Sequence, residues 1–297
     1  MTNGSIQTPV TILGGYLGAG KTTLVNHLLR NADGKRLAIL VNDFGDIAID
    51  ADLIEAQSDD IISLSGGCVC CSYGNDLFMA MSDLAKMEPA PDHVILEASG
   101  VALPGAIASS VSLLPDYCVE GIVVLADSET VRTRASDKYI GDTILRQLSD
   151  ADILLMNKAE LVDQNTRAST LEWLRDVTDG CRIIETQHAQ VDPQILLLGF
   201  GDGTGANYSH ARPAHASQHA TKFLDVSVPV EVQEFAEALL DGDPNLVRAK
   251  GFVPSCEGGL MTLQITGERI DISAAPAGAK PGLVTISLRN PPTARLA

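Results

Sequence analysis

The feature that most constrains this chain is a glycine-rich octapeptide near its N-terminus, residues 15–22, which reads GYLGAGKT. It matches the phosphate-binding loop (P-loop) pattern G-x-x-x-x-G-K-[ST] at every fixed position. The apolar run Val10–Leu13 before it predicts a buried strand, and the sequence after it predicts a helix from about Lys21 to Arg30. Strand, loop and helix in this order are the context in which the pattern binds a nucleoside triphosphate.

Each part of the P-loop has a role in holding phosphate. Glycines let backbone N–H groups approach phosphate oxygens, and the N-terminus of the following helix adds partial positive charge. We expect Lys21 to bridge the β- and γ-phosphates and the Thr22 hydroxyl to bind Mg²⁺. The predicted nucleotide-binding residues of this segment are Gly15, Gly18, Ala19, Gly20, Lys21, Thr22 and Thr23.

Short apolar runs alternate with helical patterns through the first two hundred residues. Such runs predict strands of a mostly parallel sheet that is flanked by helices on both faces, the α/β class of the P-loop NTPases. Ligands of these sheets bind at the carboxyl ends of the strands. After Val10–Leu13, the predicted strands are Leu37–Val41, Val94–Leu96, Ile122–Leu125, Ile153–Met156 and Arg182–Ile184, with one further helix over Asp76–Met87.

The pattern changes near residue 200, which predicts two domains. Residues 1–200 form the nucleotide-binding domain, and the glycine-rich, aperiodic stretch 201–221 is a linker. Residues 222–297 then predict a small C-terminal α+β domain. Its predicted elements are a strand Phe223–Val230, a helix Val232–Leu240, and strands near Leu246–Val253, Leu260–Thr266, Ile270–Ser273 and Leu283–Leu288.

Two strand ends carry further polar motifs. Asn157-Lys158-Ala159-Glu160 follows the fifth strand, where GTPases use Asn-Lys-x-Asp to recognise guanine. Glu160 is one methylene longer than aspartate, so a solvated loop or an ATP site stays an alternative. After the third strand, Glu97 can hold Mg²⁺ through water and the N–H of Gly100 can meet the γ-phosphate, although a strand-end carboxylate is often only a helix cap.

Three of the six cysteines, Cys68, Cys70 and Cys71, lie within four residues. In an extended segment Cys68 and Cys70 face the same side, and Cys71 joins them if the chain turns. Clustered thiolates suit Zn²⁺ or another soft ion. A transient disulfide and three small buried residues are the alternatives.

Charge and hydropathy restrict the other functions. The net charge of −17 at pH 7 repels phosphate backbones, so we expect no nucleic-acid partner. No apolar run approaches the roughly 18 residues of a membrane-spanning helix, and the polar N-terminal stretch lacks the features of a secretion signal. We therefore expect no membrane partner and a cytoplasmic location, where thiols stay reduced.

These motifs, together with residues 42–45, occur in the order that is typical of the CobW-like family of P-loop GTPases, which the chain resembles over nearly all of residues 8–200 and, more weakly, over 247–252. The resemblance implies a metallochaperone that binds and hydrolyses GTP with Mg²⁺. Its cargo would be Zn²⁺ or another transition metal, such as Co²⁺ or Fe²⁺, delivered to a client metalloprotein. It also implies a nucleotide- or metal-dependent homodimer, Lys21, Asp43 and Glu97 as catalytic residues, and Asp46 as a metal ligand beside the cysteines.

This chain departs from the family at several positions. The family's Asn-Glu-Phe-Gly-Glu has shorter acids here, Asp43 and Asp46, many members have glutamate in place of Val41, and the guanine-reading aspartate is Glu160. Relatives carry histidine-rich tracts in the linker. The linker of this chain contains three spaced histidines, His210, His215 and His219. They are either a reduced form of such a tract or incidental residues of a solvated linker.

We predict structural roles for the other histidines and cysteines. We expect His27 and His93 to be structural, and Cys118, Cys181 and Cys256 to be packed small residues. Turnover is expected to be slow, because these motifs hold no obvious arginine finger. Besides the GTP-dependent metallochaperone, an ATP-using P-loop enzyme and a metal buffer or sensor with little NTPase activity stay open.

Overall fold

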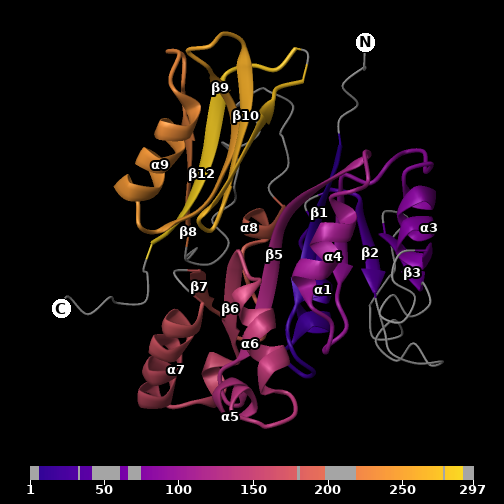
Figure 1. Cartoon of the computed structure of the whole chain (residues 1–297), viewed down its shortest axis with the longest axis vertical. Helices are drawn as coiled ribbons and strands as arrows, with labels where there is room; N and C mark the ends of the chain where they lie inside the picture. Colours follow the sequence, from indigo (N-terminus) through magenta and orange to yellow (C-terminus); the bar gives the residue numbers. More distant parts are fainter. Residues whose placement is uncertain are drawn as a thin grey trace. The chain divides into compact units, whose positions relative to one another are not determined.

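The computed structural model describes residues 7–32, 34–41, 61–65, 75–178, 181–197, 219–276 and 278–289. It divides into two compact units, one spanning Gln7–Pro193 and one containing Gln194–Ala297 (Figure 1). This boundary lies before the predicted linker, most of which falls outside the described residues. Within the second unit, buried Arg248 donates from Nη1 to the Ile195 carbonyl at 2.6 Å, which holds the segment after Pro193 against that unit.

The first unit is built on a seven-stranded sheet in the order β3-β2-β4-β1-β5-β6-β7, and every neighbouring pair is parallel. The predicted α/β class is therefore confirmed. The prediction missed one edge strand, β3. The strands are β1 (Thr8–Gly14), β2 (Leu37–Val41), β3 (Ile61–Ser65), β4 (His93–Glu97), β5 (Tyr117–Asp127), β6 (Ile153–Asn157) and β7 (Arg182–Glu185).

Helices follow most of these strands. The predicted helix after the P-loop is confirmed as α1 (Lys21–Arg30), whereas the helix predicted over Asp76–Met87 ends earlier, at Leu84. The shorter helix is α3 (Asn75–Leu84). The other helices described are α4 (Pro104–Val111), α5 (Val131–Ala135), α6 (Gly141–Ser149), the 3-10 turn η1 (Ala159–Leu161), α7 (Gln164–Val177) and α8 (Pro193–Leu197).

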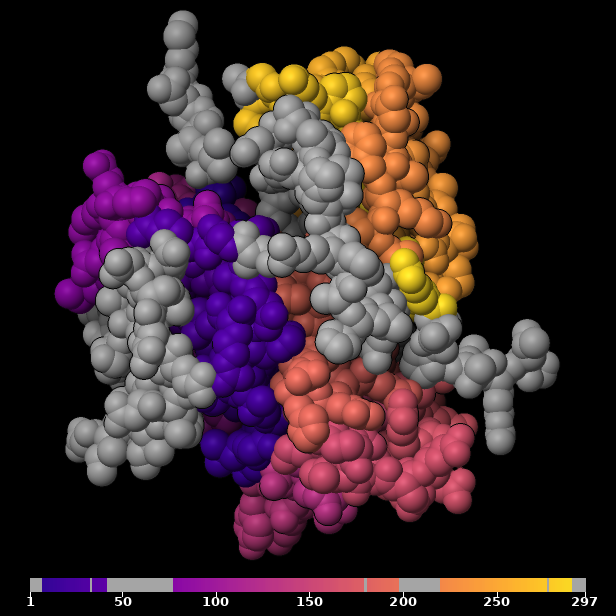
Figure 2. Space-filling model, turned by 180° about the vertical axis from the view of Figure 1, so that it is seen from behind, coloured from indigo at the N-terminus to yellow at the C-terminus, as the bar shows by residue number. Residues whose placement is uncertain are grey.

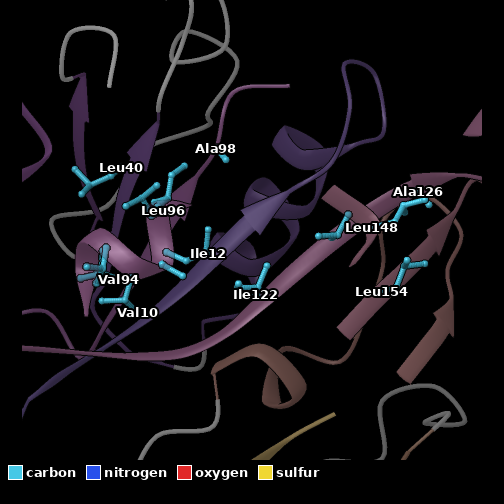
Figure 3. Packing of buried hydrophobic residues seen from close by; sticks show 14 of the residues in the cluster. Val10, Ile12, Leu40, Val94, Leu96, Ala98, Ile122, Ala126, Leu148 and Leu154 are labelled. Atoms are coloured by element: carbon cyan, nitrogen blue, oxygen red, sulfur yellow. The ribbon is translucent and has the colours of Figure 1, made fainter. Parts of the chain in front are cut away.

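One hydrophobic core lies between the sheet and helices α3, α4, α6 and α7. Alternate residues along the strands point into it, as the two-residue period of a strand requires. Their neighbours, such as Leu13 and Leu125, are also buried, so both faces of the sheet are covered. Figure 3 shows part of this packing, with Val10, Ile12, Leu40, Val94, Leu96, Ala98, Ile122, Ala126, Leu148 and Leu154 labelled.

The second unit is a small α+β domain, as predicted. Its antiparallel sheet has the order β11-β10-β9-β12-β8, and Val232 and Ala236 of α9 pack into its core. The strand predicted over Phe223–Val230 instead ends at Leu224, and in the segment that follows the Ser227 hydroxyl bonds to the Asp225 carboxylate. The elements are β8 (His219–Leu224), α9 (Val232–Gly242), β9 (Leu246–Pro254), β10 (Leu260–Thr266), β11 (Arg269–Ala274) and β12 (Gly282–Leu288).

Candidate nucleotide-binding site

The P-loop connects the end of β1 to the start of α1 through glycines in conformations that other residues rarely adopt. Gly15 has φ +126° and Gly20 has φ +106°, and a Cβ at either position would lie 2.5 Å from another atom, the Leu125 carbonyl oxygen or Asn157 Nδ2 respectively. Gly18 has φ +79° and faces open space. The loop thus packs closely on its β5 and β6 side and is open at Gly18, as a phosphate cradle requires.

Lys21, near the end of this loop, reaches back to its first residue, Gly15. Lys21 is 8% exposed, and its Nζ donates to the Gly15 carbonyl at 2.9 Å. Its ammonium therefore lies at the mouth of the cradle, where phosphate oxygens can replace the carbonyl as acceptors. Thr22 and Thr23 continue into the first turn of α1, and the helix N-terminus adds its partial positive charge.

Thr22 and Glu97 meet at the carboxyl edge of the sheet. β1 and β4 are neighbours with Leu13 opposite Glu97, and the Thr22 hydroxyl lies 3.4 Å from Glu97 Oε1. The Glu97 side chain is 3% exposed. A hydroxyl and a carboxylate are oxygen ligands that Mg²⁺ accepts. These two residues therefore fit the Mg²⁺ of a nucleoside triphosphate, held directly or through water.

The loop after β4 lies against the P-loop. A Cβ on Gly100 would come 2.8 Å from the backbone nitrogen of Leu17 and 2.5 Å from its side chain. Only glycine allows this approach. The two loops that the sequence assigned to phosphate are therefore in contact.

Asn157 is at the end of β6 and is 2% exposed, and its side-chain amide forms hydrogen bonds within the protein. Its Nδ2 donates to the Ala19 carbonyl at 2.9 Å, while its Oδ1 accepts from the Ala189 N–H at 2.8 Å and the Thr186 hydroxyl at 3.2 Å. Asn157 thus connects the P-loop to the segment after β7. α1 also meets that segment, through His27 Nε2 and the Val191 carbonyl at 2.7 Å, and Figure 2 shows the indigo and salmon segments side by side.

The two charged residues of the same motif have partners that the sequence analysis did not identify. Lys158, at φ 61°, forms an ion pair from Nζ to Asp127 Oδ2 at 2.8 Å, and that carboxylate is buried at the end of β5. Glu160 Oε1 lies 3.3 Å from Nδ1 of His188. Asp127 lies two residues after the predicted strand Ile122–Leu125, so the rule that ligands bind at strand ends could have indicated it. His188 carries no such signal.

The structure also brings a distant arginine to the P-loop. Arg134 of α5 donates from Nη1 to the Leu17 carbonyl at 2.7 Å, and its guanidinium lies 5.3 Å from the ring centroid of Tyr16. No local sequence pattern indicates this contact, because 117 residues separate its two partners. A pocket beside these residues is lined by Gly15, Tyr16, Ala19, Val124, Leu125, Ala126, Asp127, Thr130, Val131, Arg134, Ile144, Gln147 and Leu148.

The predicted metal site lies outside the part of the chain that the structure describes. Asp43, Asp46, Cys68, Cys70 and Cys71 lie outside the described residues, as do His210 and His215. Within the described ranges, no three His, Cys, Asp or Glu side chains are grouped so that they could hold a metal ion.

The isolated cysteines and His93 are described. Cys118 and Cys181 are partly buried, but the packing prediction is wrong for Cys256, which is exposed because it lies in the turn between β9 and β10. His93 is buried against the Thr11 hydroxyl at 2.8 Å.

Comparison with known proteins decides the family. Residues 9–185 match the nucleotide-binding domain of the CobW/HypB/UreG family. The chain belongs to the CobW/HypB/UreG family. This CobW-type chain is 33% identical to the zinc chaperone CobW of a Sinorhizobium species, over 96% of this chain and 94% of that protein. It is 31% identical to the zinc-regulated GTPase metalloprotein activator 1 of Schizosaccharomyces pombe, over 73% of this chain and 56% of that protein.

A solved structure supports the fold of the CobW-type chain. A zinc-bound triple mutant of the YjiA GTPase superposes with a TM-score of 0.50 at 20% identity, covering 96% of this chain and 95% of that one. At this level of identity the likeness concerns the fold. None of the helices among the described residues has the length and hydropathy to cross a membrane.

Proposed function

We propose that this chain is a GTP-binding and GTP-hydrolysing metallochaperone that carries a thiophilic divalent metal, with zinc as the favoured cargo, to a client metalloprotein. Family membership supports the GTPase part, and the names of the relatives at 31% and 33% identity support the metal part. The observation that carries the nucleotide part of the proposal is the hydrogen bond from Asn157 to Ala19. It joins the loop expected to read the base to the loop expected to hold phosphate.

The described residues support defined roles in GTP hydrolysis. Lys21 would neutralise charge on the β- and γ-phosphates, and Thr22 with Glu97 would hold the Mg²⁺ that these phosphates require. Gly100 would offer its N–H to the γ-phosphate. Bound Mg²⁺ supplies charge stabilisation to the leaving and transferred phosphates. Asp43 completes the proposed catalytic set on the strength of the family resemblance.

The base would be read by the segment after β6. The Lys158 stem, held through the ion pair to Asp127, would lie along the face of guanine, and Glu160 would accept hydrogen bonds from its N–H groups. A carboxylate acceptor favours guanine over adenine, because adenine would leave that carboxylate unpaired.

The metal would bind to Cys68, Cys70 and Cys71, with Asp46 as a further ligand. In the sequence this cluster lies between the segment containing Asp43 and the loop containing Glu97. GTP would contact the segments on either side of it and so change the geometry of its ligands. By thermodynamic reciprocity, metal must then change GTP affinity by the same factor that GTP changes metal affinity.

The experiment measures zinc affinity of the full chain with and without a non-hydrolysable GTP analogue, and phosphate release from GTP and ATP across a panel of Zn²⁺, Co²⁺ and Fe²⁺. Cys70→Ala removes a proposed ligand, and Cys256→Ala is the matched control, because this exposed cysteine lies in the other unit. We expect zinc affinity to depend on the analogue in the parent and in Cys256→Ala, and the dependence to be lost in Cys70→Ala.

Other results would contradict separate parts of the proposal. Equal zinc affinity with and without the analogue would disprove coupling. Faster release from ATP than from GTP would disprove the guanine assignment. Absence of phosphate release with any metal would favour a metal buffer or sensor.

A further inference from the structure

α5 and α6, the two helices that follow β5, contact both of the loops that we assign to phosphate. The helices pack on each other, and α6 also packs on β5. Each helix sends one polar side chain to one loop. Arg134 of α5 reaches the P-loop, and Gln147 of α6 reaches the loop that follows Glu97.

Gln147 holds the second loop through its backbone. The residue is 1% exposed, and its Nε2 donates to the carbonyls of Gly100 at 3.1 Å and Ala102 at 2.8 Å. A primary amide has two N–H donors, so both are used. Because an unpaired buried donor or acceptor is costly, this arrangement fixes the backbone around Gly100 relative to α6.

Arg134 holds the P-loop from its outer side. Its Nη1 bonds to the Leu17 carbonyl and its guanidinium lies over Tyr16. The N–H groups of a P-loop, rather than its carbonyls, surround the phosphates. Arg134 can therefore keep this bond while nucleotide is bound, and it restrains the conformation of the cradle.

The two restrained segments also touch each other, because Gly100 lies against Leu17. Their relative position matters only to a ligand that contacts both. In the roles assigned above, a nucleoside diphosphate contacts the P-loop, whereas the γ-phosphate of a triphosphate would also accept from the Gly100 N–H.

We propose that Gln147 and Arg134 are positioning residues: Gln147 holds the Gly100 loop where the γ-phosphate requires it, and Arg134 holds the P-loop in the conformation that binds the phosphates of GDP and GTP alike. The inference rests on the proposed function, in that GTP is the nucleotide. Gln147 supports triphosphate binding and hydrolysis selectively, because its contact with the site runs through Gly100. Arg134 supports diphosphate and triphosphate alike, because it acts through the P-loop.

The test compares affinities of the full chain for fluorescent GDP and a fluorescent non-hydrolysable GTP analogue, together with kcat for GTP. Gln147→Met keeps the length of the side chain and removes both donors. We expect it to weaken analogue binding and lower kcat by about tenfold, with GDP affinity kept within about twofold. Arg134→Ala should weaken both nucleotides by about tenfold, and Arg134→Lys, which keeps one donor and the charge, should recover part of the loss.

Neighbouring residues give matched controls. Arg146→Gln removes an exposed side chain on α6 that pairs with Asp142, and Arg132→Gln removes an exposed side chain on α5 that bonds to Ser169. Both controls should retain parent affinities and kcat.

A Gln147→Met protein with the parent ratio of GDP to analogue affinity would overturn the proposal. Equal weakening of both nucleotides by Gln147→Met would also overturn it, because a contact that runs only through Gly100 should spare GDP. For Arg134, parent affinities in Arg134→Ala, or no recovery in Arg134→Lys, would overturn its part. If Gln147→Met does not fold, Gln147→Asn, which keeps the amide but shortens its reach, is compared by the same ratio. If the parent prefers ATP, the GTP assignment fails while the ratio for ADP and an ATP analogue still decides this proposal. A parent that binds no nucleotide disproves both.

Discussion

The amide of Asn157 donates to the carbonyl of Ala19 at 2.9 Å, a bond between residues 138 positions apart in the chain. The same side chain accepts from the Ala189 N–H and the Thr186 hydroxyl. One buried amide therefore connects the P-loop, the end of β6 and the segment after β7. Because its Nδ2 and its Oδ1 both form hydrogen bonds within the protein, Asn157 acts by holding these segments together.

Replacing Asn157 by alanine should therefore affect both stability and binding. The substitution leaves a buried carbonyl, N–H and hydroxyl without this partner, and we expect the free energy of unfolding to fall by about 2–4 kcal/mol. GDP affinity should fall more than tenfold, because the cradle loses its support. Urea denaturation and titration with fluorescent GDP measure the two effects. Asn31→Ala, which removes an exposed bond to the His27 carbonyl, is the control. Parent-like GDP binding by Asn157→Ala would contradict this role.

The glycines of the P-loop should differ in their tolerance of alanine. Gly18 and Gly20 both have positive φ, which costs an alanine about 1–2 kcal/mol. Only at Gly20 would the new Cβ also lie 2.5 Å from Asn157 Nδ2. In the nucleotide-free protein, we expect Gly18→Ala to lower the free energy of unfolding by about 1 kcal/mol and Gly20→Ala by about 3 kcal/mol. Equal losses in chemical denaturation would show that the close contact with Asn157 is unimportant.

The sequence indicated the elements whose pattern is local. Continuous apolar runs predicted β1, β2, β4, β5, β6 and β7, because strands that are buried on both faces contain few polar residues. The edge strand β3 was missed, since the two serines of the short segment Ile61–Ser65 interrupt a continuous apolar run. The strand after the linker was placed too late, because its start at His219 lies among polar residues.

The same distinction applies to the candidate site. Lys21, Thr22, Glu97 and Asn157 belong to contiguous motifs, and the structure places them along one edge of the sheet. Arg134 and Gln147 lie on helices with no motif of their own. They reach the site only because the chain crosses from β5 back over the sheet, and that packing is not encoded in any short segment.

The contact between Glu160 and His188 should contribute to the choice of base. The extra methylene gives Glu160 one more rotatable bond than aspartate, and a neighbouring imidazole at 3.3 Å can restrain it. We expect His188→Ala to reduce the preference for GTP over ATP by about threefold to tenfold in the parent. In a Glu160→Asp background the same substitution should change the preference by less than about twofold. Competition of GTP and ATP against a fluorescent nucleotide measures all four proteins, and an equal effect in both backgrounds would contradict the restraint.

The buried hydroxyl of Tyr117 should make the stability of the first unit depend on pH in the alkaline range. It donates to the Met81 carbonyl at 2.6 Å, and burial, with a smaller effect of Asp116, raises the pKa of Tyr117 from 10.0 to about 12. Because the pKa is higher in the folded than in the unfolded state, the stabilisation is complete below pH 10 and is lost as pH rises towards 12.

Tyr117→Phe should therefore lower the free energy of unfolding by about 1–2 kcal/mol at neutral pH, since the Met81 carbonyl loses its donor. The difference from the parent should narrow between pH 10 and 12, because only the parent's unfolded state releases this proton. Denaturation curves at a series of alkaline pH values test this, with Tyr139→Phe as the control because Tyr139 is 85% exposed. If the difference in the free energy of unfolding between parent and Tyr117→Phe stays constant up to pH 12, the buried hydroxyl does not cause the loss of stability at alkaline pH.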